Sequence, residues 1–356
     1  MTLPVTPRLR GQRSQEVQLL PSIPRRSRFA AVAAAALALV VAACGSGAPS
    51  PSPSAAAPVK LVVGLGYIPN VQFAQFYYAD QQGYYEAAGL EIELQNKIDP
   101  DLITLIGQGA IDIGSADGTS VIPAVSQGIP LTYAATIYGQ FPSIVYAKAS
   151  SGIATAADLK GKKIGIPGKF GSSWVMLQAL LASADLTEND VEIVPYPDFG
   201  QGVALQQGAI DAATGFSNNE PVQLELTGED AVVLTVDEFV ALPGPGMVTG
   251  ASLATKRDAL KAFVAATLRA MDEIAADPEK GMEAAIAAVP DIASAREAQR
   301  AVLDATIAAW KNPRVTGPFG TIDTAGWDAS ITFMTDLGLV PNAVTTDKLV
   351  TTDLLP

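Results

Sequence analysis

The chain has 356 residues, 49% of them hydrophobic and 17% charged, and a formal net charge of −13. This composition is typical of folded proteins with a sizeable core, and the length favours two domains or lobes. The acidic charge argues against a nucleic-acid partner, because phosphate binding needs a basic face. With no histidine and a single cysteine, Cys44, the chain cannot form an internal disulfide, a Cys/His zinc site or a Ser-His-Asp triad, whereas a hydrolase with paired carboxylates stays open. No cofactor is expected.

The first 43 residues have the pattern of an export signal. Arg25, Arg26 and Arg28 precede an apolar run over 29–43, which is shorter than the roughly 20 residues of a membrane-spanning helix. Small residues then precede Cys44, as in bacterial lipoprotein signals, in which the cysteine is lipidated and becomes the new N-terminus. Residues 44–58, rich in Gly, Pro and Ser, would form a flexible tether. A transmembrane helix and a buried core cysteine are the alternatives.

From Lys60 onward short apolar strands alternate with helices, which indicates an α/β fold with mostly parallel sheets. The hydrophobic pattern predicts strands at 61–65, 90–94, 110–115 and 131–138. It predicts helices at 72–88, 100–108 and 119–127. Gly89 and Gly109 suit left-handed residues at the ends of two of these helices.

The sequence Gln-Gly-Ala-Ile-Asp occurs at 108–112 and again at 207–211. In both copies a helix precedes the glycine and an apolar strand follows it. This repeat favours two lobes of similar construction, and chance reuse of a common helix-to-strand turn is the alternative.

Two segments, 143–151 and 243–255, are predicted to cross between the lobes at a hinge. Lobe 1 would then comprise residues 59–145 and 245–356, and lobe 2 residues 146–244. The pattern after the second crossing is helical, over 257–276, 279–288, 295–311 and 324–337. A central cleft would lie between the lobes, and ligands of open α/β sheets bind beyond the carboxyl ends of the strands.

Four motifs, at 66–70, 83–90, 109–114 and 158–165, resemble the substrate-binding proteins of ABC importers for thiamine pyrimidine precursors and their relatives for sulfonates, nitrate and riboflavin. The resemblance implies the type II periplasmic-binding-protein fold and lobes that close on a small heteroaromatic ligand. It also implies delivery to a permease with its ATPase, outside the cytoplasm and anchored to the membrane through Cys44. A monomer is expected.

The ligand is less clearly indicated. Thiamine-precursor binders usually carry Trp where this chain has Tyr67, and often His where it has Gln72 and Phe73. The resemblance matches Glu220 to the acid that meets the aminopyrimidine. A pyrimidine precursor is therefore the first expectation, with riboflavin as the alternative. A sulfonate or nitrate comes third, because an anion needs Arg or Lys in the cleft and Lys169 is the one obvious candidate.

The candidate ligand contacts follow the predicted strand ends. Aromatic candidates for stacking on a flat ligand, of which the tyrosines also suit the core, are Tyr67, Phe73, Tyr138 and Phe216. Polar candidates for bonding ring heteroatoms are Asn70, Gln72, Asp117, Asn218 and Glu220. Several of these polar residues also suit a helix start, as caps or first-turn acids. The loop at 167–174 opens a helix whose free N–H groups favour an anion or a carbonyl, and it contributes Lys169, Gly171, Ser172 and Ser173.

Two rival functions stay open beside the binding protein. An enzyme on the same fold is the least expected, because the pyrimidine-precursor synthases that resemble this family rely on His and Cys and are not exported. A carboxylate-pair hydrolase would need Asp117 and Glu220, on opposite lobes, about 5–9.5 Å apart. A sensor or adhesin would use the same lobes without transport.

Overall fold

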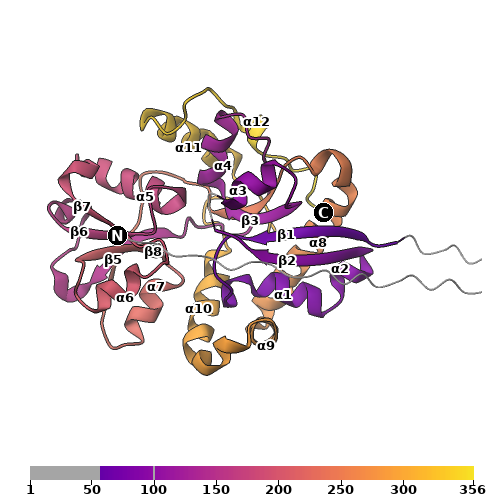
Figure 1. Ribbon diagram of the computed structural model, residues 1–356, viewed down its shortest axis with the longest axis horizontal. Coiled ribbons are helices and arrows are strands. Elements are labelled where there is room, and N and C mark those ends of the chain that lie inside the picture. Colours follow the sequence, from indigo (N-terminus) through magenta and orange to yellow (C-terminus); the bar gives the residue numbers. More distant parts are fainter. Residues whose placement is uncertain (1–56, 99–100) are drawn as a thin grey trace, which may run out of the picture. The chain divides into compact units, whose positions relative to one another are not determined.

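The computed structural model describes residues 57–98 and 101–356 (Figure 1). The predicted leader, Cys44 and the tether up to residue 56 lie outside the described residues. Within the described ranges no helix combines the length and the hydropathy that crossing a membrane requires.

The first sheet holds five strands in the order β2-β1-β3-β10-β4. They are β1 (Val59–Leu65), β2 (Leu90–Asn96), β3 (Ile113–Asp117), β4 (Thr132–Thr136) and β10 (Pro245–Thr249). Strand β1 runs parallel to β2 and β3, and β10 runs antiparallel to both of its neighbours. Leu61, Val63 and Leu65 alternate along β1 and are fully buried, as the two-residue period of a strand requires.

The second sheet repeats this design in the order β7-β6-β8-β5-β9. Its strands are β5 (Ser143–Lys148), β6 (Lys163–Ile166), β7 (Glu192–Pro195), β8 (Ala212–Phe216) and β9 (Ala231–Leu234). Here β6 is parallel to β7 and β8, and β5 is the antiparallel member. In each sheet the antiparallel strand is the one that the chain forms on arriving from the other sheet. The predicted pair of similar lobes is therefore confirmed.

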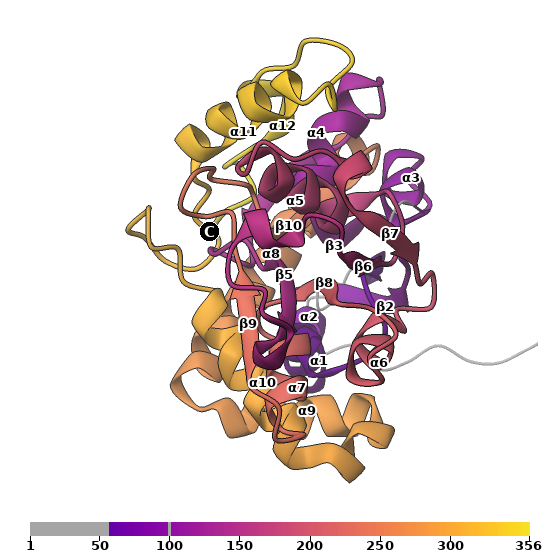
Figure 2. The ribbon, with the colours of Figure 1, turned by 90° about the vertical axis from the view of Figure 1, so that its left-hand side faces the viewer.

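Helices cover the sheets on both sides (Figures 1 and 2). Those of the first three quarters of the chain are α1 (Ala74–Gln81), α2 (Tyr84–Ala87), α3 (Asp101–Gly107), α4 (Gly118–Ser126), α5 (Gly171–Ala182), α6 (Gln201–Gln206) and α7 (Glu220–Glu225). The helical C-terminal part comprises α8 (Leu253–Ala276), α9 (Pro278–Ala288), α10 (Arg296–Ala309), α11 (Thr324–Asp336) and α12 (Thr346–Leu349).

Three hydrophobic cores hold these layers together. The first packs α1, α8, α9 and α10 against the first sheet, around Phe263 and Met271. The second is shared by both lobes, because it joins Ile106 of α3 to Leu177 of α5 and Trp327 of α11. The third lies under α6 and α7 on the far side of the second sheet. The shared core ties the two lobes to each other.

Several element boundaries differ from the sequence prediction. The helix expected over 72–88 is a 3-10 turn (Val71–Phe73) followed by α1 and α2, because Gly83 adopts a left-handed conformation with φ of +68° and interrupts it. The strand expected from residue 110 begins at Ile113, because the N–H groups of residues 110 and 111 both bond the Leu105 carbonyl in the preceding turn.

The predicted crossover segments, 143–151 and 243–255, contain β5 and β10 instead. The chain passes between the sheets just before these strands, at 137–142 and 235–244. Tyr138, expected at a strand end, therefore lies on the first passage. We propose lobe boundaries that follow sheet membership, which places the first of them at 137–142 rather than at residue 145.

Candidate functional site

A cavity opens between the two lobes at the carboxyl ends of several strands. It encloses about 860 Å³ of empty space, counting the mouth that opens to solvent. Gly66 and Tyr67 follow β1, Asp117 ends β3, and Phe216 ends β8, as expected for a ligand site in open α/β sheets. The predicted site residues that line it are Tyr67, Gln72, Phe73, Asp117, Tyr138, Gly171, Ser172, Ser173, Phe216 and Glu220.

The other predicted site residues lie elsewhere. Asn70 caps the 3-10 turn that follows it, since its side chain accepts a hydrogen bond from the Gln72 N–H at 2.9 Å. Lys169 forms an ion pair with Glu188 and lies 5.2 Å from the centre of the Trp174 ring. The cavity therefore gains no positive charge from this lysine.

Asn218 lies behind the cavity wall and is 1% exposed. Its amide donates hydrogen bonds to Gln72 Oε1 at 3.1 Å, to the Tyr138 hydroxyl at 3.3 Å and to Thr306 Oγ1 of α10 at 2.8 Å. These bonds fix two lining side chains and tie the second lobe to the C-terminal helices. Asn218 thus supports the wall instead of lining it.

Aromatic rings from both lobes line the cavity and contact each other there. The rings of Tyr67 and Phe199 meet edge to face, with centroids 4.9 Å apart and an interplanar angle of 87°. Tyr138 and Phe216 form a second such pair at 6.4 Å. Together with Phe73 and Phe170, these rings give the cavity apolar walls on which a flat ligand can stack.

Several lining residues were not predicted from the sequence, among them Ile98, Phe170, Phe199, Gln201 and Asn219. Phe170 lies within the loop at 167–174, which was predicted to contribute to the site, so it could have been predicted with that loop. Phe199 has a φ of +60°, a conformation rare for a residue with a bulky side chain. No pattern in the sequence predicts this conformation. The ring of Phe199 contacts that of Tyr67.

Asp117 ends β3 at the residue just before α4, yet its side chain makes no capping bond to that helix within the described structure. Burial raises the pKa of its carboxyl group above the ordinary value. The hydroxyl and the backbone N–H of Ser172, in the first turn of α5, act against this rise because they favour the ionised form. Ser172 in turn accepts a hydrogen bond from the Ser143 hydroxyl at 2.9 Å. Asp117 and Ser172 line the same cavity from different lobes.

Glu220 begins α7 on the opposite lobe. Its Oε2 accepts a hydrogen bond from the Phe216 N–H at 2.7 Å. Burial raises the pKa of this carboxyl, and bonds from Phe216, from Asn219 and from the Tyr67 hydroxyl act in the other direction. A Cβ added to Gly215 would lie 2.9 Å from Glu220 Oε2, so the glycine leaves room for the carboxyl.

The cavity lining combines carboxyl and amide oxygens, which accept hydrogen bonds, with tyrosine and serine hydroxyl groups. No Lys, Arg or His is found among the described residues of its lining. Gln201 donates from Nε2 to the Thr214 carbonyl at 3.2 Å, while its buried Oε1 has no partner in the described part of the chain. Such a site suits a flat ligand that carries N–H or O–H donors.

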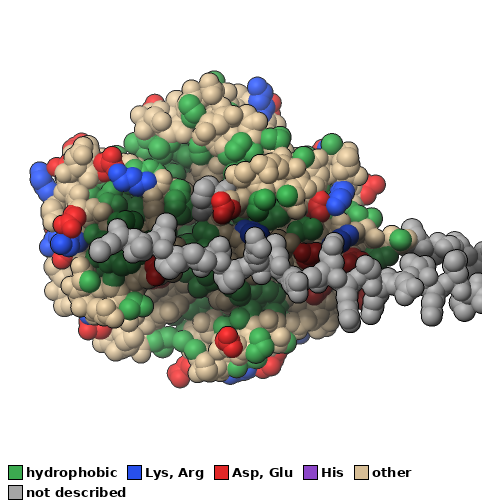
Figure 3. Space-filling model, viewed as in Figure 1, with side chains coloured by type: hydrophobic (Ala, Val, Ile, Leu, Met, Phe, Trp, Pro, Cys, Tyr) green, Lys and Arg blue, Asp and Glu red, His purple; other side chains and the backbone are tan. Residues whose placement is uncertain are grey.

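Two features concern other kinds of ligand: the grouping of acidic side chains among the described residues, and the charge on the face drawn in Figure 3. In residues 57–98 and 101–356 no three Cys, Asp or Glu side chains are grouped to hold a metal ion. On the face drawn in Figure 3, where grey atoms do not cover it, Lys and Arg side chains are scattered among Asp and Glu. That face offers no basic patch for nucleic acid.

Comparison with known proteins shows which family and which fold this chain resembles. The model of the family described as NMT1/THI5 like matches residues 70–281. Riboflavin-binding protein RibY of Chloroflexus aurantiacus is 31% identical over 304 residues, which are 83% of this chain and 86% of that protein. The 4-amino-5-hydroxymethyl-2-methylpyrimidine phosphate synthase of Legionella pneumophila is 28% identical over 181 residues, 50% of this chain and 56% of the synthase.

Among solved structures, the periplasmic aliphatic sulphonate binding protein SsuA of Escherichia coli superimposes with a TM-score of 0.66 at 18% identity, covering 83% of this chain and 99% of that protein. At this identity the likeness concerns the fold alone. It confirms the predicted type II periplasmic-binding-protein fold.

Proposed function

Because the chain belongs to the NMT1/THI5-like family, we propose that it is the substrate-binding protein of an ABC importer that captures a flat, uncharged heteroaromatic vitamin, with riboflavin as the first candidate. The lobes would close on the vitamin and the closed protein would dock on a permease, which works with its ATPase. The protein would act as a monomer outside the cytoplasm, as periplasmic binding proteins do.

The observation that carries this proposal is the composition of the cavity wall. Aromatic rings from both lobes supply stacking surfaces, and the carboxyl groups of Asp117 and Glu220 with Gln201 Oε1 supply acceptors for ring N–H groups. The isoalloxazine ring of riboflavin presents such a flat surface with an imide N–H. The name of the relative from Chloroflexus aurantiacus supports the same choice.

A pyrimidine precursor of thiamine is the second candidate, although the sequence pattern placed it first. Glu220 supports it, because a carboxyl held by the Phe216 N–H at 2.7 Å is oriented to accept from an amino group and a protonated ring nitrogen. Sulfonate and nitrate stay third. Lys169 is engaged with Glu188, and a buried anion beside two carboxyl groups would lack a positive partner.

We propose no chemical step on the ligand. Some relatives carry the names of synthases, yet this chain has no histidine, and its single cysteine lies far before the cavity residues in sequence. The two carboxyl groups that a hydrolase would use come from opposite lobes. Incubation of the protein with the bound vitamin should therefore return the vitamin unchanged by mass spectrometry.

The lipid anchor is a separate part of the proposal, and it rests on the sequence around Cys44. Expressed with its own leader in a bacterium, the protein should partition into the detergent phase of Triton X-114. Cys44→Ser should move it to the aqueous phase, whereas partition of both forms into water would contradict lipidation.

Ligand binding tests the function directly. The protein, made with Cys44→Ser so that it is not lipidated, would be titrated with riboflavin, hydroxymethylpyrimidine, taurine and nitrate. A ligand at 100 times its Kd should add about 2.7 kcal/mol of stability, which raises the melting temperature by several degrees. Riboflavin fluorescence gives an independent reading of the same binding.

Two variants locate the binding. Tyr67→Ala removes a lining ring and should weaken binding by about fivefold or more, since base-like rings stacked on aromatic side chains gain about 1–3 kcal/mol. Phe239→Ala is the matched control, because this aromatic side chain is 49% exposed and does not line the cavity. A response to hydroxymethylpyrimidine alone would favour the second candidate, and a response to taurine or nitrate alone would refute the heteroaromatic proposal.

A further inference from the structure

Two glutamine side chains line the cavity, Gln72 from the first lobe and Gln201 from the second. These residues are 6% and 2% exposed, so protein encloses both amide groups. A glutamine amide has a donor end, Nε2, and an acceptor end, Oε1, and the bonds that it makes to the protein decide which end is left for a ligand. In this cavity the two amides are fixed in opposite senses.

The orientation of Gln201 follows from one backbone group. Its Nε2 donates to the Thr214 carbonyl at 3.2 Å. Because a carbonyl oxygen only accepts hydrogen bonds, the donor end of the amide must be the one that faces Thr214. Oε1 is the end left over, and it has no partner in the described part of the chain. An enclosed acceptor without a partner costs free energy until a donor reaches it.

The orientation of Gln72 also follows from a backbone carbonyl, but through two side chains that lie between them. The Thr306 hydroxyl donates its only proton to the Val302 carbonyl at 2.7 Å. Thr306 Oγ1 must therefore accept from Asn218, whose Nδ2 lies 2.8 Å away. The same Nδ2 donates to Gln72 Oε1 at 3.1 Å, and the Tyr138 hydroxyl donates to that oxygen at 3.4 Å. The acceptor end of Gln72 is thus occupied by the protein, and Nε2 is the end left for a ligand.

We propose that Gln72 and Gln201 form a donor–acceptor pair that selects the ligand. The ligand presents an acceptor, such as a carbonyl oxygen or a ring nitrogen, to Gln72 Nε2, and an N–H or O–H donor to Gln201 Oε1. Because the two glutamines belong to different lobes, a ligand that carries both groups bonds both lobes at once and favours their closure. An imide or lactam edge, in which a carbonyl and an N–H are neighbours, has this chemistry, whereas nitrate has acceptors only. The inference deepens the proposed function and rests on its assignment of the cavity as the ligand site.

The chain offers matched variants for this pair. Gln72→Met and Gln201→Met keep the length of the side chain and remove its polar atoms. Gln206→Met is the control, because Gln206 belongs to the same helix as Gln201 but is exposed and lies outside the cavity lining.

The experiment is a calorimetric titration of the Cys44→Ser protein and of the three variants in the same background. The probes are riboflavin, whose ring has an imide N–H, and 3-methylriboflavin, in which a methyl group replaces that hydrogen. Gln201→Met should weaken riboflavin binding by about fivefold or more, because the imide N–H loses its acceptor, and should change the affinity for 3-methylriboflavin by less than about twofold. Gln72→Met should weaken both by about fivefold or more, since both keep their ring carbonyl groups. Gln206→Met should change neither.

Equal losses for the two flavins in Gln201→Met, or no loss of riboflavin binding in either lining variant, would overturn the pair while the proposed function stands. Circular dichroism establishes that each variant is folded, and Gln72→Leu or Gln201→Leu replaces a methionine variant that is not.

Two further probes separate the pair from the proposed function. Hydroxymethylpyrimidine, which has an amino donor beside a ring nitrogen, should lose about fivefold or more in either variant if it binds in place of riboflavin. Uracil has the same imide edge as riboflavin but is not a vitamin. Uracil binding that depends on both glutamines, in a protein that binds neither vitamin compound, would sustain the pair and refute the proposed function. If no probe with both groups binds, the pair is overturned.

Discussion

Asp112 and Asp211 hold equivalent places in the two lobes. Each carboxylate accepts a hydrogen bond from the backbone of the central parallel strand of its sheet, from the Val62 N–H at 2.9 Å and from the Lys163 N–H at 2.8 Å. Each aspartate N–H donates back to the carbonyl of the same strand residue, at 2.8 and 2.9 Å. The repeated sequence thus encodes a repeated clamp between a turn and a strand.

The two clamps should differ in strength. Asp112 is 4% exposed and also binds the Ser252 hydroxyl at 2.6 Å and Lys256 Nζ at 2.9 Å. Asp112→Ala should therefore destabilise the protein by about 3 kcal/mol, as expected when a buried, bonded charge is removed from its partners. Asp211→Ala should cost about 1 kcal/mol, the value of a single hydrogen bond. Urea unfolding measures both, and equal losses would contradict the asymmetry.

Glu220→Gln should stabilise the ligand-free protein at neutral pH. Burial raises the pKa of Glu220 above its ordinary value near 4.5, so the folded state prefers the protonated carboxyl. The contribution of this group is favourable below pH 4.5 and is lost as the pH rises through the folded-state pKa. Gln keeps an acceptor for the Phe216 N–H without the charge.

Melting temperatures of the parent and of Glu220→Gln between pH 4 and pH 8 test this sign. The advantage of the variant should be small at pH 4 and grow as the pH rises. Asp117, the other carboxyl group of the cavity with a raised pKa, is present in both proteins. If the melting temperature of the variant exceeded that of the parent by the same amount at every pH, a raised pKa of Glu220 would be contradicted.

Glu273→Gln should act in the opposite direction. The hydroxyl groups of Tyr84 and Tyr78 donate to this carboxylate at 2.7 and 2.8 Å and, with Arg269, lower its pKa to about 2. The stabilising contribution is therefore complete above pH 4.5 and is lost as the pH falls toward 2.

Acid titration of stability distinguishes the two forms. The parent should exceed Glu273→Gln in free energy of unfolding at pH 6, and the two curves should converge near pH 2. A difference that persists unchanged down to pH 2 would show that packing of the side chain, and not its charge, is responsible.

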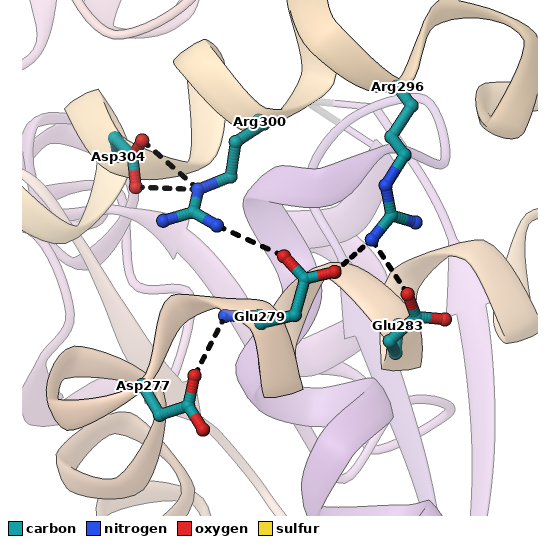
Figure 4. A network of polar contacts seen from close by, with 6 residues as sticks. All are labelled: Asp277, Glu279, Glu283, Arg296, Arg300 and Asp304. Atoms are coloured by element: carbon teal, nitrogen blue, oxygen red, sulfur yellow. Dashed lines mark hydrogen bonds and ion pairs between the residues drawn. The ribbon is translucent and has the colours of Figure 1, made fainter.

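The ion-pair network between α9 and α10 should contribute little to stability (Figure 4). Arg296 pairs with Glu279 and Glu283, and Arg300 pairs with Glu279 and Asp304. All of these side chains are at least 37% exposed, and exposed pairs are worth about 0–1 kcal/mol. Arg296→Ala should lower the urea midpoint of unfolding only slightly in dilute buffer and not measurably in 1 M salt. A large loss of stability, or one that salt leaves unchanged, would contradict this view.

The sequence predicted the lobes well because their determinants are local or repeated. Apolar alternation located β1, and the repeated turn located the strands after Gly109 and Gly208, whose φ values are +75° and +72°. The predicted boundaries of strands and lobes were wrong where pairing with distant segments determines the local structure. Whether residues 143–148 cross between the lobes or form a strand depends on β8 and β9, which lie 60 or more residues further along the chain.

The residues of the cavity likewise fall into some that the sequence predicts and others that it does not. Tyr67 and Asp117 were identified because they follow strands, a position that sequence reveals. The placement of Lys169 outside the cavity depends on Glu188 and Trp174, and no local pattern reports that pairing. Asp117 and Ser172 line the same cavity although they lie more than 50 residues apart, so their common place emerges from the fold alone.

The two antiparallel strands have a consequence for how the chain is assembled. The second sheet is built from one uninterrupted stretch, residues 143–234. The first sheet is complete only when β10, at Pro245–Thr249, has joined it. In a chain that emerges N-terminus first, β3 and β4 have no strand between them until β10 arrives. During that interval both present open edges, which are prone to pair with other chains. The lobe that begins the sequence is therefore the last to complete its sheet.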